Sequence, residues 1–300
     1  MAHDTLTIDD LGTWSFPGTA LAVLGHPIQH SLSPAMHNAA LAAMSTGDAQ
    51  FRSWKYFRFD IPPERLPEAL PLFHAKGFLG LNLTIPHKVQ AVDLIAEVVP
   101  QARALGAVNT LLATPRGWQG HNTDGYGIEQ ALQQELGASL KDASVVMLGA
   151  GGAARAIAAQ CLGSGCRELW IGNRDQVRLA ELLALVQPLV QADSSLKGFN
   201  LAEPPSELPQ KAIVINATSL GLKPEDPAPI NLSQFTAGTV VFDTTYGSHK
   251  SRLCTDTRSR GWPESNGLPM LVWQGARALE IWSRASVPAA VMRTAATAGL

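Results

Sequence analysis

A glycine-rich turn near the middle of the chain constrains its fold more than any other feature. The segment Gly149-Ala150-Gly151-Gly152-Ala153-Ala154-Arg155 directly follows the apolar run 144–148 and opens an alanine-rich helical stretch. In such strand–turn–helix units the first glycine permits the tight turn, the second lets the backbone approach a pyrophosphate, and Gly or Ala at the third position allows close packing. Unpaired N–H groups at the helix start attract the anion. The sequence therefore predicts a dinucleotide site at Gly149, Ala150, Gly151, Gly152 and Ala153.

Short apolar runs alternate with helical patterns along most of the chain, which is typical of βαβ units and a mainly parallel sheet. The runs predicted as strands are 20–24, 78–83 and 107–112 in a first unit, and 144–148, 168–171, 212–215 and 239–242 in a second. The periodic segments 125–136 and 270–282 are candidate helices that link the halves or return the chain to the first.

We therefore expect an α/β protein with two domains and a cleft between them. Residues 1–124 plus 270–300 are expected to form a discontinuous α/β substrate-binding domain, and residues 125–269 a Rossmann-like dinucleotide-binding domain with a parallel sheet.

The end of the strand predicted at 168–171 bears on the choice of cofactor. Asn173 and Arg174 stand where a cofactor without a 2′-phosphate usually meets an Asp or Glu on its ribose. Arg174 offers a planar fork of donors, and Arg178 adds a cation one helical turn later, although a solvated helix charge explains Arg178 equally well. Asp175 lies between them and would repel a phosphate or pair with an arginine itself. The pattern favours NADP, with Asn173, Arg174 and Arg178 at the cofactor, and leaves NAD use open.

Two serines follow the first predicted strand, ahead of a predicted helix at 35–44. Ser33 precedes Pro34, which makes it a candidate N-cap. Hydroxyls at Ser31 and Ser33 beside a helix N-terminus also make a carboxylate site, because donors and the positive end of the helix dipole converge there. Capping alone is an equal alternative for Ser33, but it does not explain Ser31.

Polar residues that can transfer a proton follow two other apolar runs. Lys88 lies in a proline-directed turn after the run 78–83, near the sheet edge where open α/β folds bind ligands. Asp124 supplies a carboxylate in the segment 121–125, and Asn109 an amide. Each has a structural explanation by itself, but their convergence predicts an acid–base pair of Lys88 and Asp124.

The composition excludes several classes of function. With 23 Lys and Arg against 25 Asp and Glu, the net charge of −2 provides no basic patch for nucleic acid or for an anionic membrane. The three cysteines lack paired spacing, and His26 and His30 are separated by Pro27, so we expect reduced thiols and no metal site. Residues 1–10 lack the pattern of a secretory signal, which predicts a cytoplasmic protein.

With these residues in place, the chain resembles the shikimate dehydrogenase family, and the resemblance extends from Ala20 to about Ala278. Eight motifs occur in the family's order. They are Ser31-Leu32-Ser33-Pro34, Asn82-Leu83-Thr84-Ile85-Pro86-His87-Lys88, Gly106-Ala107-Val108-Asn109-Thr110, Asn122-Thr123-Asp124-Gly125, Gly149 to Ala153, Asn173-Arg174, Asn216-Ala217-Thr218-Ser219 and Met270-Leu271-Val272-Trp273-Gln274.

The resemblance implies reversible NADPH-dependent reduction of 3-dehydroshikimate to shikimate in aromatic amino-acid (chorismate) biosynthesis. It implies that Lys88 and Asp124 are the catalytic pair and that Ser31 and Ser33 bind the substrate carboxylate. The residues it assigns to the ring hydroxyls are Thr84, Asn109, Asp124, Tyr246 and Gln274, and those it adds at the cofactor are Thr218, Thr244 and Gly267.

Two alternatives remain open at the level of the sequence. Asp175 stands where NADP-selective members of the family often have Thr, so a quinate/shikimate dehydrogenase that uses NAD or both cofactors is the main rival. The two serines favour shikimate over quinate, because quinate users often change the second. A catalytically silent nucleotide-sensing relative would keep only the dinucleotide turn. The expected partner is a small-molecule substrate, and the expected assembly is a monomer or a homodimer.

Overall fold

The computed structural model describes residues 5–300 and divides into two compact units. Residues 1–4, part of the segment on which the cytoplasmic prediction depends, lie outside the described residues. The first unit contains the chain up to Thr123 together with Gln274–Gly299, and the second contains Asp124–Trp273. Within residues 5–300, no helix combines the length and the apolar character needed to cross a bilayer.

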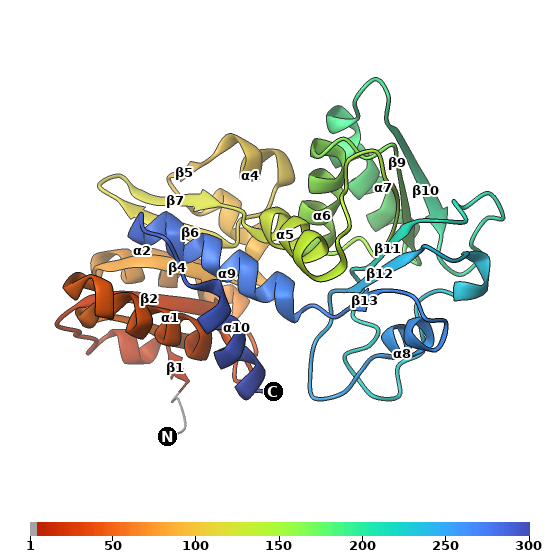
Figure 1. The fold of residues 1–300 in the computed structure, drawn as a ribbon. Coiled ribbons are helices and arrows are strands. Elements are labelled where there is room, and N and C mark those ends of the chain that lie inside the picture. Colours follow the sequence, from red (N-terminus) through yellow and green to blue (C-terminus); the bar gives the residue numbers. More distant parts are fainter. Residues whose placement is uncertain (1–4) are drawn as a thin grey trace. The chain divides into compact units, whose positions relative to one another are not determined.

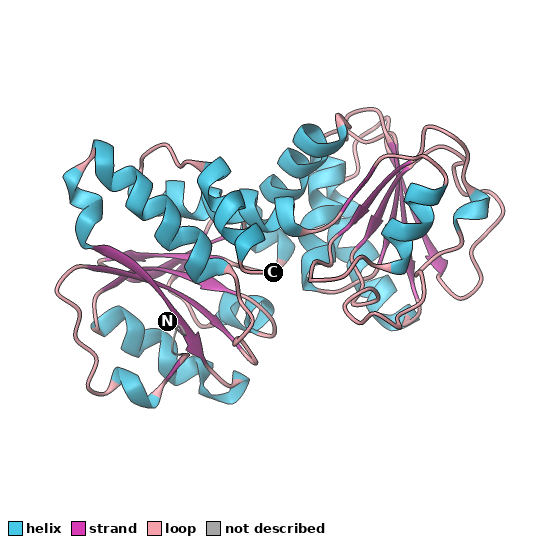
Figure 2. Ribbon diagram, turned by 60° about the horizontal axis from the view of Figure 1, so that its bottom comes forward, coloured by secondary structure: helices cyan, strands magenta, loops and turns pink. Residues whose placement is uncertain are grey.

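A seven-stranded mixed sheet forms the first unit, with strand order β1-β3-β2-β4-β6-β7-β5. Its strands are β1 (Leu6–Thr7), β2 (Thr19–Gly25), β3 (Trp54–Asp60), β4 (Phe78–Leu83), β5 (Glu97–Val98), β6 (Thr110–Thr114) and β7 (Gly117–His121). The helices of this unit cover both faces of the sheet (Figure 2). They are α1 (Ser33–Gly47), α2 (Leu66–Ala75), α3 (His87–Gln90), α4 (Pro100–Leu105), α10 (Ala289–Ala298) and the C-terminal part of α9 (Leu268–Ser283).

Strands β2 and β4 lie at the centre of this sheet, and nearly all of their residues are buried. The aromatic rings of Phe59, Phe73 and Phe78 meet edge to face on one side, at centroid distances of 4.8 to 5.8 Å. Helices α1 and α10, from opposite ends of the chain, pack side by side (Figure 1). Burial of this apolar surface is the main source of stability for the unit.

The second unit is built on a six-stranded sheet in which all neighbouring strands are parallel. Its order, β10-β9-β8-β11-β12-β13, is that of a doubly wound dinucleotide-binding fold. The strands are β8 (Ser144–Leu148), β9 (Glu168–Asn173), β10 (Ser195–Asn200), β11 (Ile213–Asn216), β12 (Val240–Asp243) and β13 (Glu264–Ser265). The helices are α5 (Asp124–Leu136), α6 (Gly152–Gly163), α7 (Gln176–Val186), α8 (Arg252–Ser259) and the start of α9.

Strand β8 has apolar side chains on both faces of the sheet, so both faces have to be buried. Val145 and Met147 belong to one apolar cluster of buried residues, whereas Val146 and Leu148 belong to another. A parallel strand buried on both faces has a continuous apolar sequence rather than an alternating one. The order of strands reverses between β8 and β11, and ligands of open α/β sheets bind outside the carboxyl ends at such a point.

The structure confirms the α/β class and the Rossmann-like unit, and six of the seven predicted strands coincide closely with observed ones. The run 107–112 is the exception, because β6 begins only at Thr110. The backbone N–H groups of Val108 and Asn109 bond instead to the carbonyls of Lys88 and His121. The first sheet is also less parallel than expected, since β6 runs antiparallel to β4 and β7.

Candidate active site

The glycine turn lies at the carboxyl ends of β8 and β11, where the strand order reverses. Gly149 has φ of +113°, and a Cβ atom there would lie 2.7 Å from the carbonyl oxygen of Ala217, so only glycine fits. Nothing lies within 4 Å of a Cβ built on Gly151 or Gly152. Helix α6 begins at Gly152, and Ala154 is fully buried, as its packing position requires. The turn therefore presents an open helix N-terminus that suits a pyrophosphate.

Asp175 has a structural role that the sequence did not indicate. It is the N-cap of α7, where its Oδ1 accepts hydrogen bonds from the backbone N–H groups of Val177 and Arg178 at 3.0 and 3.1 Å. Its Oδ2 lies 3.5 Å from Nε of Arg178. The sequence allowed Asp175 either to repel a phosphate or to pair with an arginine, and the structure shows that it pairs with Arg178.

Arg174 differs from Arg178 in this respect. Its side chain is exposed and makes no hydrogen bond or ion pair within the described part of the chain. The neighbouring Asn173 donates from Nδ2 to the backbone oxygen of Asp175 at 2.7 Å, which fixes the turn between β9 and α7. Arg174 is therefore exposed and unengaged within the described residues, whereas Arg178 is shared with the cap of α7.

Asn216 and Asp243 form a buried hub at the ends of β11 and β12. Nδ2 of Asn216 donates to Oδ1 of Asp243 at 2.9 Å, and both side chains are fully buried. Asp243 also accepts from the backbone N–H and hydroxyl of Thr245 and from the hydroxyl of Ser251, which caps α8. Oδ1 of Asn216 accepts from the backbone N–H and hydroxyl of Thr218 at 3.0 and 2.7 Å. One amide–carboxylate pair thus holds the loops that carry the predicted cofactor residues.

Two further predicted cofactor residues, Thr244 and Gly267, lie against each other. A Cβ atom at Gly267 would lie 2.0 Å from the carbonyl oxygen of Thr244, and Gly267 donates its N–H to the carbonyl of Thr245 at 2.9 Å. Any side chain at position 267 would push these segments apart. Tyr246 follows in the same loop, and its partial burial raises the pKa of its phenol.

In the first unit, Lys88 lies in the short helix α3 and is half-buried. The turn before it is closed by a hydrogen bond from the N–H of His87 to the carbonyl of Thr84 at 2.8 Å, and Thr84 itself donates to the carbonyl of Leu24. The carbonyl of Lys88 accepts from the N–H of Val108 at 2.8 Å. The backbone of Lys88 is therefore fixed beside the segment that carries Asn109.

Asn109 is the centre of a group of amides and hydroxyls. It is almost fully buried, its Nδ2 donates to Thr123 Oγ1 at 3.0 Å and to Gln274 Oε1 at 3.3 Å, and its Oδ1 accepts from the N–H of Thr123 at 2.8 Å. The structure therefore brings Asn109 and Gln274 together. Asp124 follows Thr123 directly, begins α5 and is buried.

The structure corrects one prediction for the serine pair. Ser33 is not an N-cap but the first residue of α1, with Leu32 at the N-cap position and no side-chain capping bond. Its side chain is buried, with only 6% of the residue's surface exposed. Ser31 is partly exposed, and its Oγ accepts the N–H of Ser33 at 3.3 Å. The expected pair of hydroxyls at the helix start is present, but the two have different surroundings.

The sequence interpretation missed the residues that support this site from behind. Tyr56 lies in β3, a strand that was not predicted, although the alternation in Trp54–Asp60 is a strand signal. Asn82, Thr123 and Asn216 occur in the quoted motifs but received no role. Asp243 follows an apolar run at the carboxyl end of a strand, the same signal that identified Asp124.

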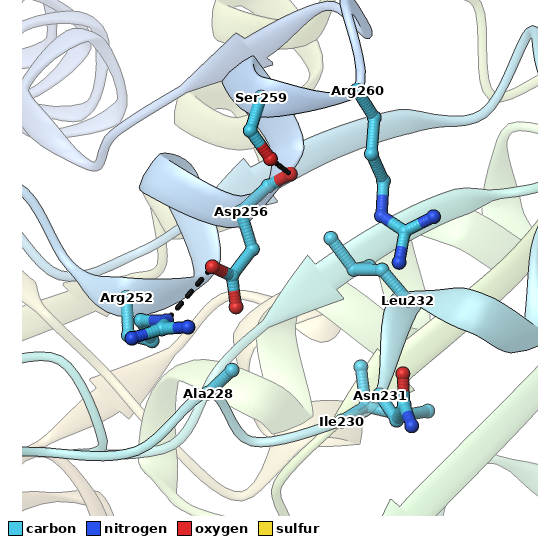
Figure 3. A pocket seen from close by; sticks show the side chains of 8 residues that line it. All are labelled: Ala228, Ile230, Asn231, Leu232, Arg252, Asp256, Ser259 and Arg260. Atoms are coloured by element: carbon cyan, nitrogen blue, oxygen red, sulfur yellow. Dashed lines mark hydrogen bonds and ion pairs between the residues drawn. The ribbon is translucent and has the colours of Figure 1, made fainter.

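A separate pocket of about 460 Å³ lies on the second unit, between the loop 228–232 and helix α8 (Figure 3). Arg252 pairs there with Asp256 at 2.7 Å, and Arg260 lies over the ring of Trp262. None of the predicted site residues lines this pocket. Among residues 5–300, no group of three or more His, Cys, Asp or Glu side chains could hold a metal ion.

The fold and these residues define a class of protein. A parallel sheet with a dinucleotide-type turn and an exposed arginine after its second strand belongs to a nicotinamide-dependent oxidoreductase. The other unit supplies a lysine beside a buried group of amides and hydroxyls, which suits a polar ring with several hydroxyls.

Comparison with known proteins identifies the family within this class. Residues 23–111 match the family model described as the shikimate dehydrogenase substrate binding domain, residues 130–221 that of shikimate / quinate 5-dehydrogenase, and residues 267–297 that of the shikimate 5'-dehydrogenase C-terminal domain. The chain is 42% identical to shikimate dehydrogenase (NADP(+)) of Symbiobacterium thermophilum over 95% of both proteins. The chain belongs to the shikimate dehydrogenase family.

Solved structures agree with this assignment. Shikimate 5-dehydrogenase of Thermus thermophilus, in complex with NADP(H) and shikimate, is 34% identical and matches with a TM-score of 0.82 over 94% of this chain and 100% of that one. Quinate dehydrogenase of Corynebacterium glutamicum, in complex with NAD, is 28% identical with a TM-score of 0.82 over 94% and 99%. The fold is therefore shared by shikimate and quinate enzymes, and the side chains have to distinguish them.

Proposed function

We propose that the protein is an NADP-dependent shikimate dehydrogenase, which interconverts 3-dehydroshikimate and shikimate in aromatic amino-acid biosynthesis. The observation that carries the proposal is the hydrogen bond from Val108 to the backbone of Lys88, which fixes this lysine beside Asn109. The family assignment and the names of its similar NADP(+) enzymes support the same activity.

The protein's part in the reaction is proton transfer and orientation. When bound, NADP(H) supplies the hydride that is added to the carbonyl carbon. Lys88 gives a proton to the carbonyl oxygen as it becomes a hydroxyl, and takes that proton back in the reverse direction. Asp124 holds the same hydroxyl and compensates the charge of Lys88. Atoms and charge therefore balance in both directions of the reaction.

We assign the substrate-binding role to the first unit. Ser31 and Ser33 bind the carboxylate, and Thr84, Asn109, Gln274 and Tyr246 bind the ring hydroxyls. A buried site that pairs each substrate hydroxyl discriminates strongly, because a ligand without one of them leaves buried polar groups unpaired.

The second unit has the features that NADP requires. The open space over Gly151 and Gly152 accepts the pyrophosphate, and the exposed Arg174 accepts the 2′-phosphate, supported by Arg178 and Asn173. Gly149, Ala150 and Ala153 complete the turn. Thr218, Thr244 and Gly267 lie on the loops held by Asn216 and Asp243, and we place the nicotinamide half there.

The test is the initial rate of nicotinamide reduction with shikimate or quinate and with NADP or NAD, in all four pairings. We expect rapid reduction only with shikimate and NADP. Comparable rates with quinate or NAD would replace the proposal with the broader quinate/shikimate activity, for which the family model and the Corynebacterium enzyme are precedents. No reduction in any pairing by a folded protein would favour a nucleotide-sensing relative.

We further propose that the enzyme works in the cytoplasm as a monomer or homodimer, without nucleic-acid or membrane partners. The nearly balanced charge supports this proposal, because it gives the protein no electrostatic attraction to nucleic acid or to an anionic membrane. Light scattering after size exclusion gives the assembly, and a mass above twice 31.9 kDa would contradict it.

A further inference from the structure

We propose that Asp243 is a positioning residue for the nicotinamide half of the cofactor. Its side chain is fully buried at the end of β12, so it acts through the loops that it holds and not by touching a ligand. The inference rests on the proposed function, which places the nicotinamide by Thr218, Thr244 and Gly267. It adds that one carboxylate behind these residues keeps all three in place.

Four hydrogen-bond donors converge on this carboxylate. Its Oδ1 accepts from Nδ2 of Asn216 at 2.9 Å, and from the N–H and the hydroxyl of Thr245 at 3.0 and 2.9 Å. Its Oδ2 accepts from the hydroxyl of Ser251 at 2.5 Å. A carboxylate only accepts hydrogen bonds, so Asp243 can serve all four donors without offering one of its own.

Asn216 links Asp243 to the loop after β11. Oδ1 of Asn216 accepts from the backbone N–H of Thr218 at 3.0 Å. Because this N–H can only donate, the amide oxygen must face Thr218, and the amide nitrogen must face Asp243. The same Nδ2 also donates to the carbonyl of Leu220 at 2.9 Å. With a further bond of 2.7 Å from its hydroxyl to Asn216, Thr218 is held at both its backbone and its side chain.

Thr245 links Asp243 to the segment that carries Gly267. The carbonyl of Thr245 accepts the N–H of Gly267 at 2.9 Å, and the carbonyl of Asn216 accepts the N–H of Thr244 at 2.9 Å. The backbones of Thr244 and Gly267 touch, since a Cβ atom at Gly267 would lie 2.0 Å from the carbonyl oxygen of Thr244. A shift of Thr245 would therefore move both of these proposed nicotinamide residues.

The two loops meet at Gly221, next to the carboxylate. Gly221 has φ of +107°. A Cβ atom there would lie 2.9 Å from Cβ of Ser251, 3.0 Å from Oγ1 of Thr245 and 3.3 Å from Oδ2 of Asp243. Nε2 of His249 donates to the carbonyl of Gly221 at 3.1 Å. Removal of the carboxylate would leave buried donors unpaired in this close contact, so the loops would have to separate to let water in.

The position of Arg174 in the sheet separates the two halves of the cofactor site. Arg174, proposed for the 2′-phosphate, follows β9, which is separated from β12 by β8 and β11. A displaced loop after β12 would shift the nicotinamide and leave this phosphate contact in place. A misplacement of about 1 Å can cost on the order of 100-fold in rate. Loss of Asp243 should therefore lower turnover and the affinity for the whole cofactor, but not the affinity for its adenosine half.

The test uses Asp243→Ala and compares NADP with adenosine 2′,5′-bisphosphate, which carries the phosphate proposed for Arg174 but has no nicotinamide. We expect turnover of shikimate at saturating NADP to fall by about 10–100-fold and the calorimetric Kd of NADP to rise by about tenfold. The Kd of the bisphosphate should stay within about twofold. Equal weakening of both ligands, or wild-type turnover and NADP affinity in a folded variant, would overturn the inference.

Asp243→Asn is the conservative variant that should restore the position. Its amide oxygen can accept the three bonds now made to Oδ1, and its amide nitrogen can donate to Oγ of Ser251. We expect its turnover and its Kd for NADP to stay within about threefold of wild type. Losses as large as those of Asp243→Ala would show that the accepted bonds do not position the loops, and would overturn the inference.

Thr245→Val keeps the inference testable if Asp243→Ala does not fold. It keeps the shape and removes only the hydroxyl bond to Asp243, so we expect the Kd of NADP to rise by about threefold and that of the bisphosphate to stay the same. Ser144→Ala is the matched control. It also removes a buried hydroxyl bonded to a carboxylate, that of Glu168 at 2.6 Å, but at the amino end of β8.

We expect Ser144→Ala to lower thermal stability and to leave both Kd values unchanged. A rise in the Kd of NADP in this control, or no rise in Thr245→Val, would overturn the inference. Binding is measured without shikimate, which separates the inference from the proposed function. A wild-type protein that binds NADP but does not oxidise shikimate would overturn the proposed substrate, while the two Kd values still decide the role of Asp243. A wild-type protein that does not bind NADP would overturn both.

Discussion

Both units bury polar side chains in or next to their strands, but they use different chemistry. In the first unit the buried groups are neutral amides and hydroxyls, in a continuous network from Tyr56 through Asn82 and Asn109 to Thr123. In the second unit the buried hub is a carboxylate, Asp243, and the exposed group after β9 is a guanidinium.

This difference corresponds to the ligands that we propose for the two units. A polyhydroxylated ring is selected by neutral partners, each of which is left unpaired when the wrong ring binds. A cofactor phosphate is bound by backbone N–H groups and arginine. The buried carboxylate of Asp243 therefore has to accept hydrogen bonds from the loops that it holds, and not from the cofactor site. Substitutions of the proposed substrate residues in the first unit should therefore leave cofactor parameters unchanged, and substitutions of Arg174, Asp175 and Arg178 in the second unit should leave substrate parameters unchanged.

The largest expected effect is that of Lys88→Ala. We expect turnover to fall by about 10²–10⁴-fold, the usual contribution of a positioned acid–base group, with the KM of NADP unchanged. Steady-state kinetics at saturating NADP measures the loss. Lys76→Ala is the control, because this lysine lies in the same unit and, among residues 5–300, its ammonium bonds only to the carbonyl of Gly12. Full turnover by a folded Lys88→Ala protein would remove the lysine from the mechanism.

The second prediction concerns acid stability and belongs to the first unit. Among the described residues, burial lowers the pKa of three histidines, and all of them lie in that unit: His37, His87 and His121. For His37 the pKa falls from 6.5 to about 3 because the ring is fully buried, and neither ring nitrogen has a hydrogen-bond partner among the described residues. The unfolded chain therefore binds the extra proton first. The contribution of a neutral His37 to stability is complete above pH 6.5 and is lost between pH 6.5 and 3.

Urea unfolding between pH 7 and pH 4 measures this loss. At about 1.4 kcal/mol per pH unit, His37 accounts for about 3 kcal/mol by pH 4. His37→Phe keeps a ring against Tyr56 but cannot take up a proton, so we expect a flatter pH dependence that retains only the contributions of the other two histidines. Equal slopes for the two proteins would contradict the burial of a neutral His37.

The third prediction tests the second unit. Arg174→Ala should raise the KM of NADP by about 10–100-fold, the equivalent of roughly 1.5–3 kcal/mol for a lost charged hydrogen bond, and should barely change that of NAD. Arg178→Ala is the comparison, and its effect should be smaller because that arginine is already close to Asp175. Arg174→Ala should leave the KM of shikimate unchanged. Equal losses with both cofactors would place Arg174 away from the 2′-phosphate.

The sequence was sufficient to predict the elements whose residues have a single structural role. Strands β2, β4 and β8 are apolar over their length, and Gly149 to Gly152 follow a strand and open a helix, so periodicity and glycine spacing were sufficient. The strand predicted at 107–112 was only half right, because the backbone N–H groups of Val108 and Asn109 donate to the carbonyls of Lys88 and His121 instead of joining the strand. Local pattern carries no information about such distant partners.

The side-chain partnerships were beyond a local interpretation for the same reason. Ser33 had the sequence context of an N-cap, but it is the first residue of α1 and makes no capping bond. Asp175 had the context of a ribose ligand, but its carboxylate accepts from two N–H groups of the next helix. In both cases the same residue type satisfies two roles, and only the arrangement in space decides between them.

Asp175 also provides the smallest and most specific test of the comparison between the units. Asp175→Asn keeps an oxygen that can accept from Val177 and Arg178, so the cap of α7 is preserved. It removes a negative charge near the proposed phosphate and releases the guanidinium of Arg178, so the KM of NADP should fall by about threefold, or ~0.6 kcal/mol. The KM of NAD should stay the same or rise, and shikimate parameters should not change. If Asp175 instead binds a ribose, the same substitution would weaken NAD strongly, and the carboxylate would then be a cofactor ligand in addition to a helix cap.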